Sequence, residues 1–249
     1  MQASDREYAA PANATPRKLA ALVLGNTVVA SDDDDITKFD YTDINNLLNN
    51  NTLDSFRKGE RQSLGNVLLT GATGYLGIHI LQELIRSDAE NIYCLVRDKD
   101  LDVAEHRLKT LLFYYFESTY DELFGNRLHI LLGDVTNDLT NLVQVKIDTV
   151  FNCAAVVKHF SEGTEIEDVN VGGAQRCVDL CLKTGARLVH ISTYSTSGLN
   201  VNDTMAPDYV FTEQKLFDGQ YLGNQYVHSK FLAERIVLQS IADKGLSAH

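Results

Sequence analysis

The sequence lacks features that would each indicate a different class of protein. It has four cysteines, Cys94, Cys153, Cys177 and Cys181, but none has the paired CxxC spacing of a zinc site. No segment approaches the roughly 20 consecutive apolar residues of a membrane span. Basic residues are scarce, with 22 Lys and Arg against 34 Asp and Glu, so the net charge is −12. Because nucleic-acid binding needs clustered Lys and Arg, we expect no zinc site, no membrane and no nucleic acid.

The N-terminal part of the chain differs in composition from the rest. Residues 1–36 are rich in Ala, Pro and Asn and contain the acidic run 32–35, so we expect a flexible tail or linker. Residues 17–30 join two basic residues to an apolar stretch, as a signal peptide does, but Asp5, Glu7 and a polar interruption argue against one. We therefore expect a cytoplasmic protein in which residues 37–63 form a helical lead-in to a main domain at 64–249.

In the main domain, short apolar runs alternate with stretches of helical periodicity. Strands that are apolar throughout and alternate with helices are typical of a parallel sheet covered on both faces. The pattern predicts a doubly wound α/β fold of the Rossmann type. We expect strands at 66–70, 91–96, 128–132, 149–153 and 188–192, and helices at 76–86, 102–117, 166–184 and 224–243.

A glycine-rich loop joins the first predicted strand to the first of these helices. After Thr70 it reads Gly71-Ala72-Thr73-Gly74-Tyr75-Leu76-Gly77. Glycines allow a tight turn and a close approach of the backbone to phosphate, and the N-terminus of the next helix attracts negative charge. We therefore expect the pyrophosphate of a dinucleotide at this loop. Its G-x-x-G-x-x-G spacing resembles that of extended short-chain dehydrogenases/reductases.

The second predicted strand ends at Arg97, where the adenosine ribose of a dinucleotide is bound in this fold. An acidic residue at this place would bind the ribose hydroxyls and favour NAD. An arginine instead pairs with a 2′-phosphate and favours NADP. Asp98 and Asp100 are close enough in sequence to keep the NAD alternative open. We predict NADPH as the cofactor.

Tyr226 and Lys230 form a Y-x-x-x-K pair on the last predicted helix, and no other tyrosine of the chain has Lys four residues later. Residues four apart lie on one helix face, one turn apart. Reduction of a carbonyl by hydride leaves an oxyanion that needs a proton, and a nearby ammonium makes a tyrosine hydroxyl more acidic. We therefore expect Tyr226 to be the general acid, with Lys230 activating it and binding the nicotinamide ribose.

The resemblance to extended short-chain reductases implies roles for further cofactor-binding residues. Asp134, after the third predicted strand, matches the family's contact with the adenine amino group, and Val135 beside it is also expected to bind the cofactor. Asn152 and Ala154 end the fourth predicted strand in a segment similar to the family's N-x-A-A, which lies beside the cofactor.

The same resemblance implies a third catalytic hydroxyl after the fifth predicted strand. Residues 191–198 are similar to the family's S-[ST]-x-x-V-Y-G segment, and matching by position puts Thr193 at the catalytic hydroxyl. Ser192 and Ser195 are alternatives, because Thr196-Ser197 stands where the family has Val-Tyr.

Longer segments resemble one branch of the family. Residues 67–77, 94–97, 152–160 and 226–234 together look like a thioester reductase domain, as found at the end of nonribosomal peptide synthetases and in carboxylic acid reductases. The resemblance implies that NADPH reduces an acyl or peptidyl thioester held on the phosphopantetheine arm of a carrier protein, so that an aldehyde or alcohol leaves. Residues 1–65 contain no G-G-x-S phosphopantetheine site, so the carrier is expected to be a separate domain.

The resemblance also implies further strands and a substrate subdomain after His249. We therefore expect the chain to be C-terminally incomplete, with exposed apolar surface at the outer sheet edge and weak turnover in isolation. Two alternatives stay open. Another extended short-chain enzyme, such as a nucleotide-sugar epimerase or dehydratase or a ketone reductase, would share Thr193, Tyr226 and Lys230. A non-catalytic NADP-sensing protein would commonly lack the tyrosine.

Overall fold

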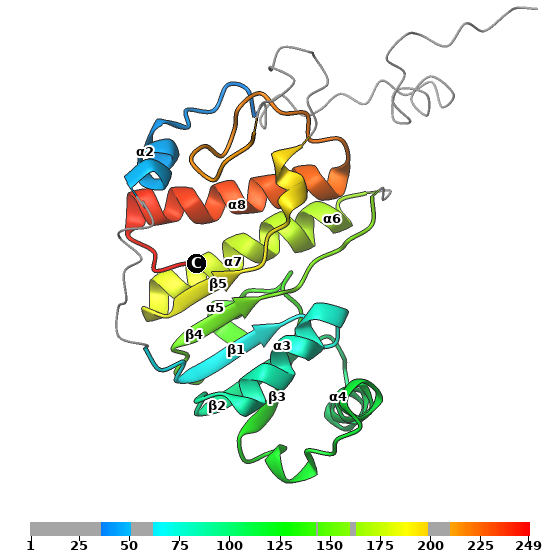
Figure 1. The fold of residues 1–249 in the computed structure, drawn as a ribbon. Helices are drawn as coiled ribbons and strands as arrows, with labels where there is room; N and C mark the ends of the chain where they lie inside the picture. Colours follow the sequence, from blue (N-terminus) through cyan, green and yellow to red (C-terminus); the bar gives the residue numbers. More distant parts are fainter. Residues whose placement is uncertain (1–35, 51–61, 143, 160–162, 199–209) are drawn as a thin grey trace, which may run out of the picture. The chain divides into compact units, whose positions relative to one another are not determined.

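The computed structural model describes residues 36–50, 62–142, 144–159, 163–198 and 210–249. The chain divides into two compact units, Met1–Asp40 and Tyr41–His249, and the second contains all the helices and strands named below (Figure 1). The expected tail, apart from residue 36, and most of the lead-in after residue 50 lie outside the described residues.

Five parallel strands form one sheet in the order β3-β2-β1-β4-β5. The chain order reverses beside β1, which pairs with β2 on one side and with β4 on the other. In this fold, ligands bind outside the carboxyl ends of the strands at such a reversal. The predicted fold class is confirmed. The strands are β1 (Asn66–Thr70), β2 (Asn91–Val96), β3 (Leu128–Leu132), β4 (Thr149–Asn152) and β5 (Arg187–His190).

Helices cover both faces of the sheet (Figure 1). Val67 and Leu69 of β1 pack in one apolar cluster with α3 and α4, whereas Leu68 packs in a second cluster with α7 and α8. Because both faces are buried, β1 is apolar throughout instead of alternating with polar residues. The helices are α2 (Thr42–Asn50), α3 (Tyr75–Arg86), α4 (Leu101–Phe116), α5 (Leu139–Leu142), α6 (Glu165–Glu167), α7 (Gly173–Thr184) and α8 (Gln225–Lys244).

Several predicted elements differ from the observed ones in their bounds, and three of these differences have a structural cause. β4 ends at Asn152, because the next two backbone N–H groups donate to the Thr70 hydroxyl instead of continuing a strand ladder. β5 ends at His190, and the carbonyl of Ile191 accepts a hydrogen bond from Lys230 on α8. The predicted helix at 166–184 consists of α6, a π-helical segment at Asp168–Gly172 and α7.

The outer edge of β5 is paired with the last residues of the chain. The N–H of Leu188 donates to the carbonyl of Ser247 at 2.8 Å, and the N–H of His249 donates to the carbonyl of Leu188 at 2.9 Å. Leu188 is fully buried, and no β5 residue is among the large exposed hydrophobic side chains of the described chain. The expected exposed apolar surface at this edge is therefore not found in the described residues.

All four cysteines are free thiols, and burial raises the pKa of Cys153 and of Cys181 to about 12. Within the described part of the chain, no helix combines the length and the apolar character needed to cross a membrane.

Candidate active site

Glycines shape the loop between β1 and α3. Gly71 has a φ of +71°, which other residues rarely adopt. A Cβ on Gly77 would lie 2.0 Å from the carbonyl oxygen of Gly71, so no side chain fits there. No side chain caps α3 at Gly74. The N–H groups of the first helical turn are therefore available to an anion such as a pyrophosphate.

A cleft of about 270 Å³ lies at the carboxyl ends of β1 to β4. These four strand ends flank the reversal of strand order, where a dinucleotide binds in this fold. The structure therefore brings most of the predicted cofactor-binding residues into one cleft. Those that line it are Gly71, Thr73, Gly74, Arg97, Asp134, Val135 and Ala154.

Five predicted cofactor-binding residues of the strand ends and loop do not line this cleft, namely Thr70, Tyr75, Leu76, Gly77 and Asn152. Thr70 is fully buried, and its hydroxyl donates to Asn152 Oδ1 at 3.0 Å and accepts from the N–H groups of Cys153 and Ala154 at 3.1 Å each. Thr70 and Asn152 therefore hold the ends of β1 and β4 together behind the cleft. The side chains of Tyr75 and Leu76 are exposed on α3, so only their backbone can serve a phosphate there.

The charged residues after β2 differ in the groups that they contact. Arg97 is exposed at the rim of the cleft, with Nη1 3.6 Å from Asp134 Oδ2. Asp98 lies 3.8 Å from Arg107, and Asp100 accepts from the N–H of Val103 at the N-terminus of α4. Exposed ion pairs are weak, so Arg97 can exchange its partner for a phosphate, whereas both aspartates serve the local fold.

The helix α8 carries the Tyr–Lys pair. Asn224 caps it by accepting from the N–H of Val227 at 3.0 Å, so Tyr226 lies in the first turn. The Tyr226 ring meets the edge of the His159 ring, with centroids 6.4 Å apart. This contact places a titratable side chain from the loop after β4 beside the tyrosine.

Lys230 is buried one turn along the helix from Tyr226. Only 3% of its surface is exposed, and Nζ donates to the carbonyl of Ile191. Burial lowers the pKa of Lys230 to about 8, against the opposing effects of Glu234 and Cys153. Burial, and then the charge of Lys230, lowers the pKa of His190 to about 3, so this imidazole is neutral.

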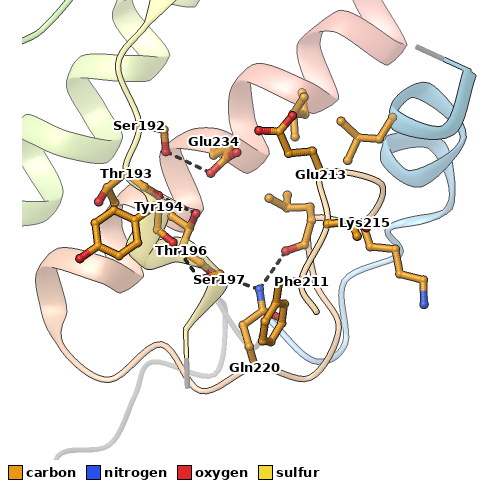
Figure 2. Close-up of a pocket in the computed structure, with 14 residues that line it drawn as sticks. Ser192, Thr193, Tyr194, Thr196, Ser197, Phe211, Glu213, Lys215, Gln220 and Glu234 are labelled. Carbon is orange, nitrogen blue, oxygen red and sulfur yellow. Dashed lines mark hydrogen bonds between the residues drawn. The ribbon is translucent and has the colours of Figure 1, made fainter. Parts of the chain in front are cut away.

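Thr193 lies in the wall of a second, larger cavity of about 720 Å³. Its hydroxyl accepts from the N–H of Ser195 at 3.3 Å, at the start of a short 3₁₀ helix, Tyr194–Ser197. Ser192 and Glu234 line the same cavity, and Figure 2 shows the Ser192 hydroxyl bonded to Glu234. Tyr226 and Lys230 are not among the described residues that line it, so the structure does not place Thr193 in one cavity with that pair.

Asn170 is a site residue that the motifs did not reveal. It is buried in the π-helical segment, and it both accepts from and donates to the backbone of Val156, at 2.8 and 3.1 Å. Its Nδ2 also donates to the Ser229 hydroxyl at 2.8 Å, which in turn donates to the carbonyl of Tyr226. Asn170 thus ties the cleft wall at Val156 to the helix that carries Tyr226. The π-helical turn that presents it is not visible in helical periodicity.

Comparison with known sequences identifies the family. The family described as male sterility protein, a group of NAD-binding domains, matches residues 69–248. The chain belongs to this family. Among curated relatives, a carboxylic acid reductase of Mycobacterium tuberculosis is 31% identical over 202 residues, which is 72% of this chain and 17% of the relative. A nonribosomal peptide synthetase, asaC, of Aspergillus flavus is 29% identical over 199 residues, 75% of this chain and 19% of the relative.

Solved structures of reductase domains are similar to this member of the family. A thiolation-reductase di-domain from an archaeal nonribosomal peptide synthetase is 42% identical with a TM-score of 0.78, over 87% of this chain and 59% of that one. The reductase domain of the aureusimine biosynthetic cluster is 30% identical with a TM-score of 0.71, over 84% and 53%. The chain thus spans a little over half of these reductase structures and a small part of the curated relatives.

These relatives confirm the predicted resemblance to terminal reductase domains and the prediction of an oxidoreductase that binds a nicotinamide cofactor. A UDP-glucuronic acid 4-epimerase of Bacillus cereus, solved with NAD, is 19% identical with a TM-score of 0.51. At that identity the likeness shows a shared fold alone, so it does not favour the nucleotide-sugar alternative.

Proposed function

We propose that this chain is the cofactor-binding and catalytic part of a reductase that uses NADPH to reduce an acyl or peptidyl thioester on the phosphopantetheine arm of a carrier protein. An aldehyde is released, or an alcohol after a second reduction. The likeness to a thiolation-reductase di-domain, over most of the chain, supports the carrier-bound substrate. The UDP-glucuronic acid 4-epimerase, at 19% identity, shares only the fold.

The position of the Lys230 ammonium is the observation that carries this proposal. Lys230 Nζ donates to the carbonyl of Ile191, whose N–H donates to the carbonyl of Asn152 at 3.2 Å, directly before Cys153 in the cleft wall. Asn170 links the same wall to the start of α8. The Tyr–Lys pair is therefore attached to the cleft to which we assign the dinucleotide.

Each group in the site has a part in the reaction. The backbone of the Gly71–Gly77 loop binds the pyrophosphate, Arg97 binds the 2′-phosphate, and Lys230 binds the nicotinamide ribose. Asp134, Val135 and Ala154 surround the adenosine and the centre of the cofactor, and Asn152 supports the cleft wall from behind through its bond to Thr70. The bound nicotinamide supplies the hydride.

The substrate side of the site stabilises and protonates oxygen. Thr193 donates a hydrogen bond to the thioester carbonyl, and Tyr226 gives its proton to the oxyanion as this forms. Lys230 stabilises the tyrosinate that remains, because its ammonium lies one turn from Tyr226 on the same helix.

Activity assays on the full-length protein test the proposed reaction directly. We expect NADPH oxidation with an acyl-phosphopantetheinyl carrier, followed by absorbance at 340 nm, with release of free carrier thiol and an aldehyde or alcohol product. UDP-sugars should give no turnover. Interconversion of a nucleotide sugar, without thioester reduction, would instead establish the nucleotide-sugar alternative.

The cofactor preference depends on Arg97. We expect Arg97→Ala to weaken NADPH binding to this chain about tenfold, because a charge-assisted hydrogen bond to the 2′-phosphate is lost. NADH binding should change less than twofold. Isothermal titration checks both values, with Arg86→Ala as the control, since that exposed arginine pairs with Glu83 on α3. Equal losses for both cofactors would remove Arg97 from phosphate recognition.

A further inference from the structure

Two charged side chains of α8 hold two consecutive residues just before Thr193. Lys230 Nζ donates to the carbonyl of Ile191, and the Ser192 hydroxyl donates to Glu234 Oε2 at 3.0 Å (Figure 2). Lys230 and Glu234 are four residues apart, so they lie one turn apart on one helix face. β5 ends at His190, and the N–H of Ile191 still donates to the carbonyl of Asn152 on β4 at 3.2 Å, so the two bonds from α8 hold the chain where the sheet ends.

We infer that Lys230 and Glu234 form a two-point clamp on Ile191–Ser192 that sets the position of Thr193 relative to Tyr226, with Glu234 as a positioning residue. The inference rests on the proposed function, because it concerns how that site is assembled. Tyr226, Lys230 and Glu234 follow one another at intervals of one turn, so the helix that carries the acid also fixes the segment that carries the third hydroxyl.

The clamp continues into the 3₁₀ helix that follows Thr193. The Thr196 hydroxyl donates to the carbonyl of Thr193 at 2.9 Å, and Thr196 also interacts with Glu234. Burial raises the pKa of Glu234, while its bonds to Ser192 and Thr196 and the charge of Lys230 lower it. The Glu234 carboxylate is therefore held in place by these partners, which is what a positioning role requires.

The clamp also separates the candidate hydroxyls. The Ser192 hydroxyl gives its only proton to Glu234, so it is not available to a substrate carbonyl. The Thr193 hydroxyl accepts from the N–H of Ser195, which leaves its own proton to donate. The clamp therefore favours Thr193 over Ser192 as the catalytic hydroxyl.

Kinetics of the full-length enzyme test the clamp. Ser192→Ala and Glu234→Ala remove the same bond from opposite sides, so we expect each to lower kcat about tenfold with KM and NADPH affinity within twofold. The double variant should be no slower than the slower single one. Glu234→Gln, which keeps an acceptor for Ser192, should recover most of the lost rate. Asp243→Asn, at an exposed site on the same helix, is the control.

Hydrogen exchange of the chain itself gives a second readout that needs no turnover. We expect Ser192→Ala and Glu234→Ala each to speed exchange in a peptide covering residues 191–198, with no change for Asp243→Asn. Unchanged exchange would overturn the clamp. A wild-type kcat in both single variants would also overturn it. So would a double variant whose loss of kcat equals the product of the two single losses, provided that the wild-type enzyme is active. Failure of the proposed function is seen differently, as absence of thioester reduction by the wild-type protein.

Discussion

Replacement of Tyr226 by Phe should reduce thioester turnover by the full-length enzyme about 100- to 10,000-fold, the usual contribution of a general acid. NADPH binding should stay within twofold of the wild type. The described contacts of Tyr226 use its ring and its carbonyl, not its hydroxyl, so Phe keeps the packing against His159 and the bond from Ser229. The loss should therefore fall on kcat.

Single-turnover kinetics with saturating NADPH separate this outcome from a binding defect. Tyr114→Phe is the matched control, because Tyr114 is exposed on α4 and lies outside the cleft. A variant of Tyr226 with wild-type kcat would show that another group protonates the oxyanion. His159, whose ring lies against Tyr226, would then be the first residue to replace.

The sequence was sufficient to predict the strands at the centre of the sheet. β1, β2 and β3 have the predicted bounds, because their apolar runs are buried on both faces and are followed by polar or glycine-rich segments. The ends of β4 and β5 were predicted too late. Cys153 and Ile191 continue the apolar character of these strands, but the N–H groups of Cys153 and Ala154 donate to Thr70 and the carbonyl of Ile191 accepts from Lys230.

Only part of the site was predicted, again because tertiary bonds are not visible in the sequence. Motif spacing reports local geometry, so it located the phosphate loop and the pair at Tyr226 and Lys230. It does not report which distant residues share a buried polar group. Thr70 and Asn152 are joined across 82 positions, and Asn170 reaches Ser229 across 59. Such bonds carry no signal in a single sequence, and they decide which side chains face the cleft and which support it.

Replacement of Lys230 by Met should make the chain more stable while abolishing turnover. The difference between the ordinary lysine pKa of 10.5 and the value of about 8 in the folded protein corresponds to about 3 kcal/mol of destabilisation of the charged form. Met has a similar length and no charge. Loss of this hydrogen bond from a charged donor to Ile191 offsets about 2 kcal/mol, so we expect the free energy of unfolding to rise by about 1 kcal/mol at pH 7.

The pH dependence of that gain identifies its cause. Because the folded-state pKa lies below the unfolded value, the unfolded wild-type chain binds more protons between about pH 8 and pH 10.5, and wild-type stability rises across this window. The advantage of Lys230→Met should therefore shrink between those pH values. Urea unfolding at pH 7 and pH 10 measures it, with the exposed Lys244→Met as control.

A destabilised Lys230→Met variant at pH 7 would mean that the bond to Ile191 contributes more than burial costs. The expected gain instead links the two roles of this lysine. The wild-type fold retains a buried ammonium at a cost in stability, since that ammonium holds the segment before Thr193 and lies one turn from the hydroxyl of Tyr226. Stability and catalysis then place opposite demands on one side chain, as is common where a site depends on a buried charge.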